Sequence, residues 1–296
     1  MRRTALLLAA ALLALPHAGA PAPTPPAPPA RRVVSLAPSL TETLFALGAG
    51  DALVGVTSFC DYPEAAKAKP KVGGMEDGGV DLERVLSLKP DLVVSIGEGQ
   101  TRTVDALRRL GLRVEVVPSQ TVEDVFSSLR RLGTLVGRDA AAQRLGGDLE
   151  RRMAAVKNAL AAAPGLRRPR VFYEVWDRPL MTATRNTLIG QLIELAGGVN
   201  VFGELSGRYI EVSSEALLER NPEVILAPDH HAKRVSLQNL AERPDLAGVE
   251  AVKRGRIVIL EGDLVSRPGP RIADVLELLA RSLHPELFPG RPGDRR

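Results

Sequence analysis

Residues 81–95 read DLERVLSLKPDLVVS and residues 213–227 read SSEALLERNPEVILA, and the two stretches follow one plan. Each begins with a short amphipathic run that ends before a proline, Pro90 or Pro222, and each continues with a run rich in β-branched residues. An amphipathic run followed by a short apolar run is typical of a helix followed by a buried strand. The repeat therefore predicts two similar α/β lobes, and a two-lobed protein commonly binds its ligand in the cleft between the lobes.

The repeat also places one equivalent glutamate in each lobe. Glu83 and Glu215 stand at the same distance before the two prolines. A glutamate near a helix N-terminus is common and stabilises the helix by well under about 1 kcal/mol at an exposed site. The matched positions nevertheless favour a second interpretation, in which the two charges dock a partner that has two-fold symmetry.

Composition excludes several classes of protein. The 296 residues, 45% of them hydrophobic, suit two domains of ordinary size with real cores. The formal net charge is +4, but arginine is spread along the chain and no basic stripe carries interleaved aromatic residues, so no nucleic-acid partner is expected. Cys60 is the single cysteine, which excludes an internal disulfide and a cysteine metal cluster.

The N-terminus has the pattern of a secretory signal. Arg2 and Arg3 precede an apolar run over residues 5–15, and Ala18-Gly19-Ala20 follows. This order predicts a signal peptide over residues 1–20, cleaved near Ala20, and a periplasmic location. No cysteine stands at the expected cleavage point, so no lipid anchor is expected there. Residues 21–30 are a proline-rich leader that has nothing to bury.

The rest of the chain alternates between strand and helix patterns. We predict an N-terminal lobe over residues 31–137 and a C-terminal lobe over residues 165–284, with a loose tail at 285–296. Predicted strands cover residues 33–36, 53–56, 92–95, 114–117, 170–176, 224–227 and 256–260. Predicted helices cover residues 41–47, 82–88, 104–110, 188–196, 214–219, 237–240 and 271–283. Ser39 is the expected N-cap of the first helix, with Glu42 completing a capping box.

A long helix is predicted between the lobes, over residues 138–164. Asp139 is a good N-cap, Pro164 is a good stop, and Gly146-Gly147 is the weak point of the pattern. About 24 residues at 1.5 Å each would reach roughly 36 Å, enough to cross from one lobe to the other. The fold class expected is α/β, with two Rossmann-like lobes and mainly parallel sheets joined by one long interdomain helix. Such a stiff link would restrict lobe closure to a small rocking motion.

Several segments resemble the substrate-binding proteins of ABC importers whose lobes are joined by one helix, which carry cobalamin, haem or iron–siderophores. The resemblance covers nearly all of residues 31–284 and is strongest to the cobalamin-binding members. It is carried by VVSLAPSLTE at 33–42, GVTSFCDYP at 55–63, LER at 82–84 with LKPDLV at 88–93, GGVNVF at 197–202, VSSE at 212–215 and RPGPRI at 267–272. The resemblance implies no catalysis and no resident cofactor, a monomeric protein, and delivery of the ligand to a permease dimer with its ATPase subunits.

The resemblance also implies roles for particular residues. Family counterparts of Glu83 and Glu215 meet arginines on the permease subunits, and Glu76 and Glu98 are weaker candidates for the same role. Ligand contact is implied for aromatic or apolar side chains that can lie on a flat corrin face and for polar groups that can reach its amides. These candidates are Tyr62, Trp176, Met181, Tyr209, Asp263 and Arg267. For Phe59, a place in the core and a place in the cleft are equally expected.

The chain departs from the cobalamin-binding pattern, which leaves the ligand open. The family has tryptophans in two loops of the first lobe, where this chain reads Gly73-Gly74-Met75-Glu76 and Ile96-Gly97-Glu98, and its cysteine pair is missing. Haem or a ferric siderophore is the alternative ligand. His231, beside His230, is a weak candidate to ligate haem iron or corrin cobalt.

A third hypothesis is a secreted metal-dependent enzyme that uses Asp229, His230 and His231. The chain has no GxSxG, P-loop or HExxH motif and no GxGxxG after a strand, so enzyme motifs give this hypothesis no support.

Overall fold

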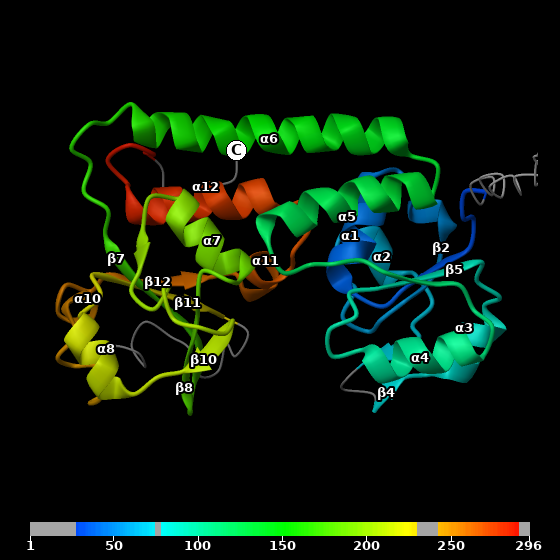
Figure 1. Ribbon diagram of the computed structural model, residues 1–296, viewed down its shortest axis with the longest axis horizontal. Helices are drawn as coiled ribbons and strands as arrows, with labels where there is room; N and C mark the ends of the chain where they lie inside the picture. The colour runs from blue at the N-terminus through cyan, green and yellow to red at the C-terminus, as the bar shows by residue number, and fades with distance from the viewer. Residues whose placement is uncertain (1–27, 75–77, 230–241, 290–296) are drawn as a thin grey trace, which may run out of the picture.

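The computed structural model describes residues 28–74, 78–229 and 242–289. Two α/β lobes lie side by side, and one long helix, α6 (Asp139–Ala161), runs across both (Figure 1). The predicted fold class is therefore confirmed. The predicted signal peptide and most of the proline-rich leader lie outside the described residues, as do Glu76, His230, His231, the predicted helix at 237–240 and the end of the tail.

The elements of the N-terminal lobe follow one another in short units. They are β1 (Val33–Ser35), α1 (Pro38–Ala46), η1 (Gly50–Ala52), β2 (Leu53–Val56), α2 (Glu64–Lys67), β3 (Gly73–Gly74), β4 (Gly79–Val80), α3 (Leu82–Ser87), β5 (Leu92–Ser95), α4 (Thr101–Arg109), β6 (Val114–Val116) and α5 (Val122–Leu135).

The C-terminal lobe continues the alternation. Its elements are β7 (Arg170–Asp177), β8 (Leu180–Ala183), α7 (Leu188–Leu195), β9 (Val199–Asn200), β10 (Tyr209–Glu211), α8 (Ser214–Arg220), β11 (Val224–Pro228), α10 (Glu250–Lys253), β12 (Ile257–Leu260), α11 (Gly262–Ser266) and α12 (Ile272–Leu283).

The main sheet of the N-terminal lobe has the order β2-β1-β5-β6, and each neighbouring pair is parallel. Successive strand residues point to opposite faces, so a fully buried strand needs apolar residues at every position. Val33 belongs to the core that includes residues of α1 and α5, while Val34 belongs to the core that includes residues of α3 and α4. Helices therefore cover both faces of the sheet.

The sheet of the C-terminal lobe has the order β10-β8-β7-β11-β12, with β9 also paired to β7. β7, β11 and β12 are parallel, whereas β8 and β10 add antiparallel edges that the sequence patterns did not predict. Tyr173 packs with α7 and α12 on one face, and Phe172 packs with α8 and α10 on the other.

The internal repeat recurs in the backbone. Lys89 and Asn221 have φ of +46° and +43°, and within the described ranges they are the non-glycine residues with positive φ. Both precede the repeated proline, whose ring disfavours the right-handed helical conformation in the residue before it. The side chain of Arg32 donates to the Lys89 carbonyl, and the side chain of Arg170 donates to the Asn221 carbonyl. In each lobe, an arginine at or just before the start of the first strand thus holds the turn that follows the repeated helix.

The repeated acid after the proline has the same role in both copies. Asp91 accepts hydrogen bonds from the backbone N–H groups of Arg31 and Arg32, at 2.9 and 3.0 Å. Glu223 accepts a 3.0 Å hydrogen bond from the backbone N–H of Arg170. These acids hold the start of the first strand of each lobe.

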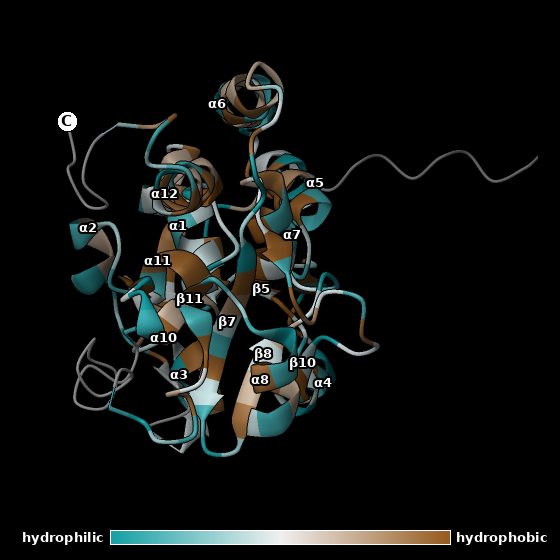
Figure 2. Cartoon of the chain, turned by 90° about the vertical axis from the view of Figure 1, so that its left-hand side faces the viewer, coloured by the Kyte–Doolittle hydropathy of each residue, from teal (hydrophilic) through white to brown (hydrophobic). Residues whose placement is uncertain are grey.

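The 23 residues of α6 reach about 34 Å at 1.5 Å per residue. Ala142, Leu149 and Val156 form its buried stripe, and the helix packs on α5 of one lobe and α12 of the other. Figure 2 shows α6 end-on above these two helices. A Cβ at Gly133 of α5 would lie only 2.7 Å from the Ala142 Cβ, so glycine permits this close approach.

Other contacts also make the link between the lobes stiff. The guanidinium of Arg152, on α6, pairs with Asp274 at 2.6 Å and Glu277 at 2.9 Å on α12. One continuous core contains residues of α1, α5, α6, α7 and α12, so it extends through both lobes. Gly146-Gly147 does not interrupt the helix. The restriction of lobe closure to a small rocking motion stays a prediction.

Two predicted helix caps are wrong. α1 begins at Pro38, with Ala37 as N-cap, so Ser39 lies inside the helix and no capping box forms. Proline suits the first helical turn, where its missing N–H costs nothing. α6 has Arg138 as N-cap, and Asp139 is instead its first helical residue, where the carboxylate accepts from the Thr134 hydroxyl at 2.5 Å.

Candidate ligand-binding cleft

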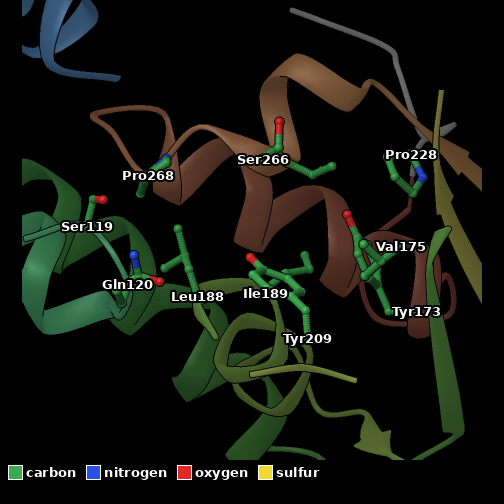
Figure 3. A pocket seen from close by; sticks show the side chains of 11 residues that line it. Ser119, Gln120, Tyr173, Val175, Leu188, Ile189, Tyr209, Pro228, Ser266 and Pro268 are labelled. Carbon is green, nitrogen blue, oxygen red and sulfur yellow. The ribbon is translucent and has the colours of Figure 1, made fainter. Parts of the chain in front are cut away.

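A cavity of about 160 Å³ lies where the two lobes face each other (Figure 3). The N-terminal lobe contributes Ser119 and Gln120, from the segment between β6 and α5. The C-terminal lobe contributes Tyr173, Val175, Leu188, Ile189, Tyr209, Pro228, Val265, Ser266 and Pro268. The cavity is thus mainly apolar, with phenol, hydroxyl and amide groups that can orient a ligand.

Parallel strands bring part of this lining together. β7 and β11 run side by side, and Val175 and Pro228 lie near their carboxyl ends. In open α/β sheets ligands bind at this edge, because the loops that follow the strands gather there. Antiparallel β8 then adds β10 to the sheet, and β10 brings in Tyr209.

Both cavity tyrosines favour the neutral phenol. Tyr173 is 4% exposed, and its burial raises the pKa of its phenol. Partial burial, together with the negative charge of Glu98, raises the pKa of Tyr209. A neutral phenol both donates and accepts hydrogen bonds, and its ring offers apolar area to a flat ligand.

An ion pair joins the lobes beside the cavity. Arg208 Nη1 donates to Glu98 Oε2 at 3.0 Å, and Arg208 Nη2 contacts the other carboxylate oxygen. Gln120, from the cavity lining, also donates its amide to Glu98. The hydrogen bond from Arg208 lowers the pKa of Glu98, so this carboxylate is ionised at neutral pH.

A second set of ion pairs crosses between the lobes at Arg267. Its guanidinium pairs with Asp61 at 2.6 Å, with Asp263 at 2.9 Å and with Glu42 at 3.2 Å. The Arg267 side chain is 10% exposed and lies away from the cavity lining, although Ser266 and Pro268 beside it belong to that lining. Asp61 and Glu42 belong to the N-terminal lobe, so their pairs with Arg267 join the lobes, whereas Asp263 pairs with Arg267 within the C-terminal lobe.

The remaining predicted ligand residues, Tyr62, Trp176 and Met181, are not among the residues that line the cavity. The Arg271 guanidinium carbon lies 4.3 Å from the centre of the Tyr62 ring, which is 43% exposed. Trp176, near the end of β7, donates its indole N–H to the Arg178 carbonyl at 2.8 Å and faces Met181 in the strand register. Of the predicted ligand residues, Tyr209 is therefore the one that lines the cavity. Phe59 is 37% exposed, and its ring lies against Gly74.

Glu83 and Glu215 occupy equivalent positions in their lobes. Each is the second helical residue after an N-cap, Asp81 in α3 and Ser213 in α8, and the side chain of each N-cap accepts a hydrogen bond from a backbone N–H. Both glutamates are exposed in the first turn of a short helix. The structure thus presents two matched negative charges, one on each lobe.

Sequence patterns missed ten of the eleven residues that line the cavity, among them Tyr173 and Gln120, and they also missed Arg208 beside it. Tyr173 could have been found from strand alternation, because it lies two residues before Val175 on β7 and so points to the same face of the sheet. Gln120 lies three residues after the end of the predicted strand at 114–117, at the edge where ligands bind. Arg208 carries no such signal, because its partner Glu98 is 110 residues away in the chain.

The described residues give a metal centre no support. Within residues 28–74, 78–229 and 242–289, no group of three or more His, Cys, Asp and Glu side chains is placed to hold a metal ion. Asp229 is engaged, since it accepts a 2.6 Å hydrogen bond from the Gly262 N–H. In the same ranges no helix is both long and apolar enough to cross a bilayer.

Two α/β lobes, a connecting helix packed on both and a cavity lined by both define the class of two-lobed binding proteins. The periplasmic binding protein family model matches residues 33–264, and the chain belongs to this family. The family consists of substrate-binding proteins rather than enzymes.

Relatives and solved structures extend this finding. An uncharacterized ABC transporter substrate-binding lipoprotein, YvrC of Bacillus subtilis, is 30% identical over 87% of this chain and 81% of its own length. A vitamin B12-binding protein of Pectobacterium carotovorum is 31% identical over 91% of this chain and 89% of its own length. The periplasmic vitamin B12-binding protein BtuF of Vibrio cholerae has a TM-score of 0.74 at 28% identity, covering 88% of this chain and 99% of that structure. The apo periplasmic heme-binding protein RhuT of Roseiflexus sp. RS-1 has a TM-score of 0.78 at 26% identity, covering 87% and 99%.

Proposed function

We propose that this protein captures a corrinoid in the cleft between its lobes in the periplasm and delivers it to an ABC import permease. The observation that carries the proposal is the cavity that both lobes line, with Gln120 on one side and Tyr173 and Tyr209 on the other. Apolar side chains and neutral phenols suit the flat face of a corrin ring, and amides or hydroxyls suit its amide rim. The vitamin B12-binding relatives support this choice of ligand.

Capture requires the lobes to move apart. A cavity of about 160 Å³ is smaller than the roughly 300–1,000 Å³ that encloses a drug-sized ligand. The contacts that close it on the Glu98 side are partly exposed, with side-chain exposures of 46% for Glu98 and 38% for Arg208. An ion pair at such an exposed site stabilises the contact between the lobes by about 0–1 kcal/mol, which is weak enough for the lobes to separate.

Delivery is assigned to Glu83 and Glu215. Their equivalent exposed positions suit two arginine-bearing subunits related by a two-fold axis, and long-range attraction between such charges speeds association more than it adds affinity. In this proposal binding and delivery use different residues, since neither Glu83 nor Glu215 lines the cavity.

Haem is the second candidate ligand, because the RhuT structure has the same fold over nearly its whole length. Tyr62 and Tyr209 are exposed phenols that could ligate iron after ionisation. The raised pKa of Tyr209 opposes that ionisation in the ligand-free protein. Haem ranks behind a corrinoid because the vitamin B12-binding relative of Pectobacterium carotovorum is 31% identical to this chain, against 26% for RhuT.

Absorption spectra of the protein after gel filtration test the proposal. The protein is mixed with cyanocobalamin in one sample and with haemin in another, and unbound ligand is removed. We expect the corrin bands to elute with the protein. A Soret band with the protein, and no corrin absorption, would favour haem and overturn the corrinoid assignment.

A further inference from the structure

The closed cleft carries a charged pair at its edge, Glu98 of the N-terminal lobe and Arg208 of the C-terminal lobe. Arg208 contacts both carboxylate oxygens of Glu98, and the Gln120 amide donates to the same carboxylate. Gln120 and Tyr209, the neighbour of Arg208, both line the cavity (Figure 3). The pair therefore lies where the rim of a flat ligand would reach.

A ligand that separates the lobes must break this pair. Glu98 then keeps the Gln120 amide as a donor but needs a replacement for the Arg208 donors, and Arg208 needs an acceptor. A primary carboxamide offers both, because its NH₂ group donates and its carbonyl accepts. A carboxylate offers acceptors alone, so it can pair with Arg208 but cannot replace the donor that Glu98 loses, and it adds a like charge beside Glu98.

We propose that Glu98 and Arg208 are specificity-determining residues that select a ligand rimmed by carboxamides over one rimmed by carboxylates. This inference rests on the proposed function and extends it to the chemistry of the ligand rim. The selection combines attraction with rejection: Arg208 accepts either ligand, and Glu98 penalises the carboxylate form. Leaving a polar group without a partner is what lets a binding site reject a close analogue.

Two corrin compounds that share one ring test the pair. Dicyanocobinamide carries amide side chains, and dicyanocobyrinic acid carries carboxylates in their place. The quantity measured is the ratio of their dissociation constants at pH 7.5 and 0.15 M salt. Any effect of a substitution on lobe opening cancels in this ratio, because it acts on both compounds equally.

The wild-type protein should bind the amide compound more tightly. Glu98→Gln should reduce the preference by about tenfold, since the glutamine side chain no longer repels a carboxylate and can donate to it. Arg208→Gln should change the ratio in the opposite direction, because a carboxylate loses more than an amide when the guanidinium is removed. Glu150→Gln, on the exposed surface of α6, removes the same charge away from the cleft and should leave the ratio unchanged.

The possible outcomes distinguish a failure of the role of the Glu98–Arg208 pair from a failure of the proposed function. Tight binding of the amide compound with the same ratio in the wild-type protein and Glu98→Gln would overturn the role of the pair alone. An equal change in Glu150→Gln would overturn it as well, since net charge would then explain the preference. Absence of binding of both corrin compounds to the wild-type protein would overturn the proposed function and this inference with it.

Discussion

Glu42 and Arg271 form a doubly hydrogen-bonded ion pair that joins the two lobes. Arg271 Nε donates to Glu42 Oε2 and Arg271 Nη2 donates to Glu42 Oε1, both at 2.8 Å. The Glu42 side chain, on α1, is 1% exposed, and the Arg271 side chain, just before α12, is 14% exposed. A planar guanidinium matches a carboxylate in this geometry.

Removing the carboxylate should destabilise the protein strongly. Glu42→Ala leaves Arg271 and Arg267 without their buried partner, and breaking such a pair costs about 3–5 kcal/mol. Urea unfolding followed by circular dichroism measures the loss in free energy of unfolding. Glu123→Ala, which removes an exposed partner of Arg130, is the matched control and should cost less than about 1 kcal/mol. Equal losses in the two variants would contradict the role of the buried pair.

The stability of the C-terminal lobe should depend on pH through Glu174. This side chain of β7 is 3% exposed, and burial raises its pKa from 4.5 to about 7, although Arg243 lies 2.9 Å away and opposes the shift. Between these pH values the folded protein holds a proton that the unfolded chain releases. The free energy of unfolding therefore falls as pH rises from about 4.5 to about 7.

Glu174→Gln removes this titration. Relative to the wild-type protein, the variant should gain about 2–3 kcal/mol in free energy of unfolding between pH 4.5 and pH 8, at 1.36 kcal/mol for each pKa unit. Urea unfolding of both proteins at the two pH values supplies the comparison. A difference between them that does not vary with pH would show that Glu174 titrates as an exposed glutamate does.

The docking assignment predicts a separation of binding from transport. Glu83→Ala combined with Glu215→Ala should leave ligand affinity unchanged, because neither residue lines the cavity. The same double variant should reduce corrinoid uptake by cells that carry the cognate permease at least tenfold. Glu123→Ala combined with Glu219→Ala removes one exposed helix glutamate from each lobe and should preserve uptake. Normal uptake with the first double variant would refute the assignment.

Local patterns predicted the lobes and their order well, and the reason is visible in the repeat. Lys89 and Asn221, each followed by a proline, stand only a few residues before the strands β5 and β11. The turn that separates each repeated helix from its strand is therefore determined by neighbouring residues. The predicted N-caps at Ser39 and Asp139 were wrong because each helix begins one or more residues earlier than predicted, with Ala37 and Arg138 as the N-caps. Pro38 begins α1, and Glu42, assigned to the cap, is instead buried against Arg271.

The cleft was harder to predict because its contacts join distant parts of the chain. Glu98 and Arg208 are 110 residues apart, and Glu42 and Arg271 are 229 apart. Each of these charges has an ordinary local sequence, and only the packing of two lobes beneath α6 brings them together. Arg267 shows the same limit: its position near the cleft could be expected, but its pairing with Asp61 could not.

One corrinoid should occupy the cleft between the lobes, and calorimetric titration with cyanocobalamin measures this binding. We predict a single site per chain with a micromolar or lower Kd, weakened about tenfold or more in Tyr209→Ala, which loses a cavity ring, and unchanged in Glu150→Gln. Absence of heat at micromolar protein, or an affinity that Tyr209→Ala does not alter, would contradict it.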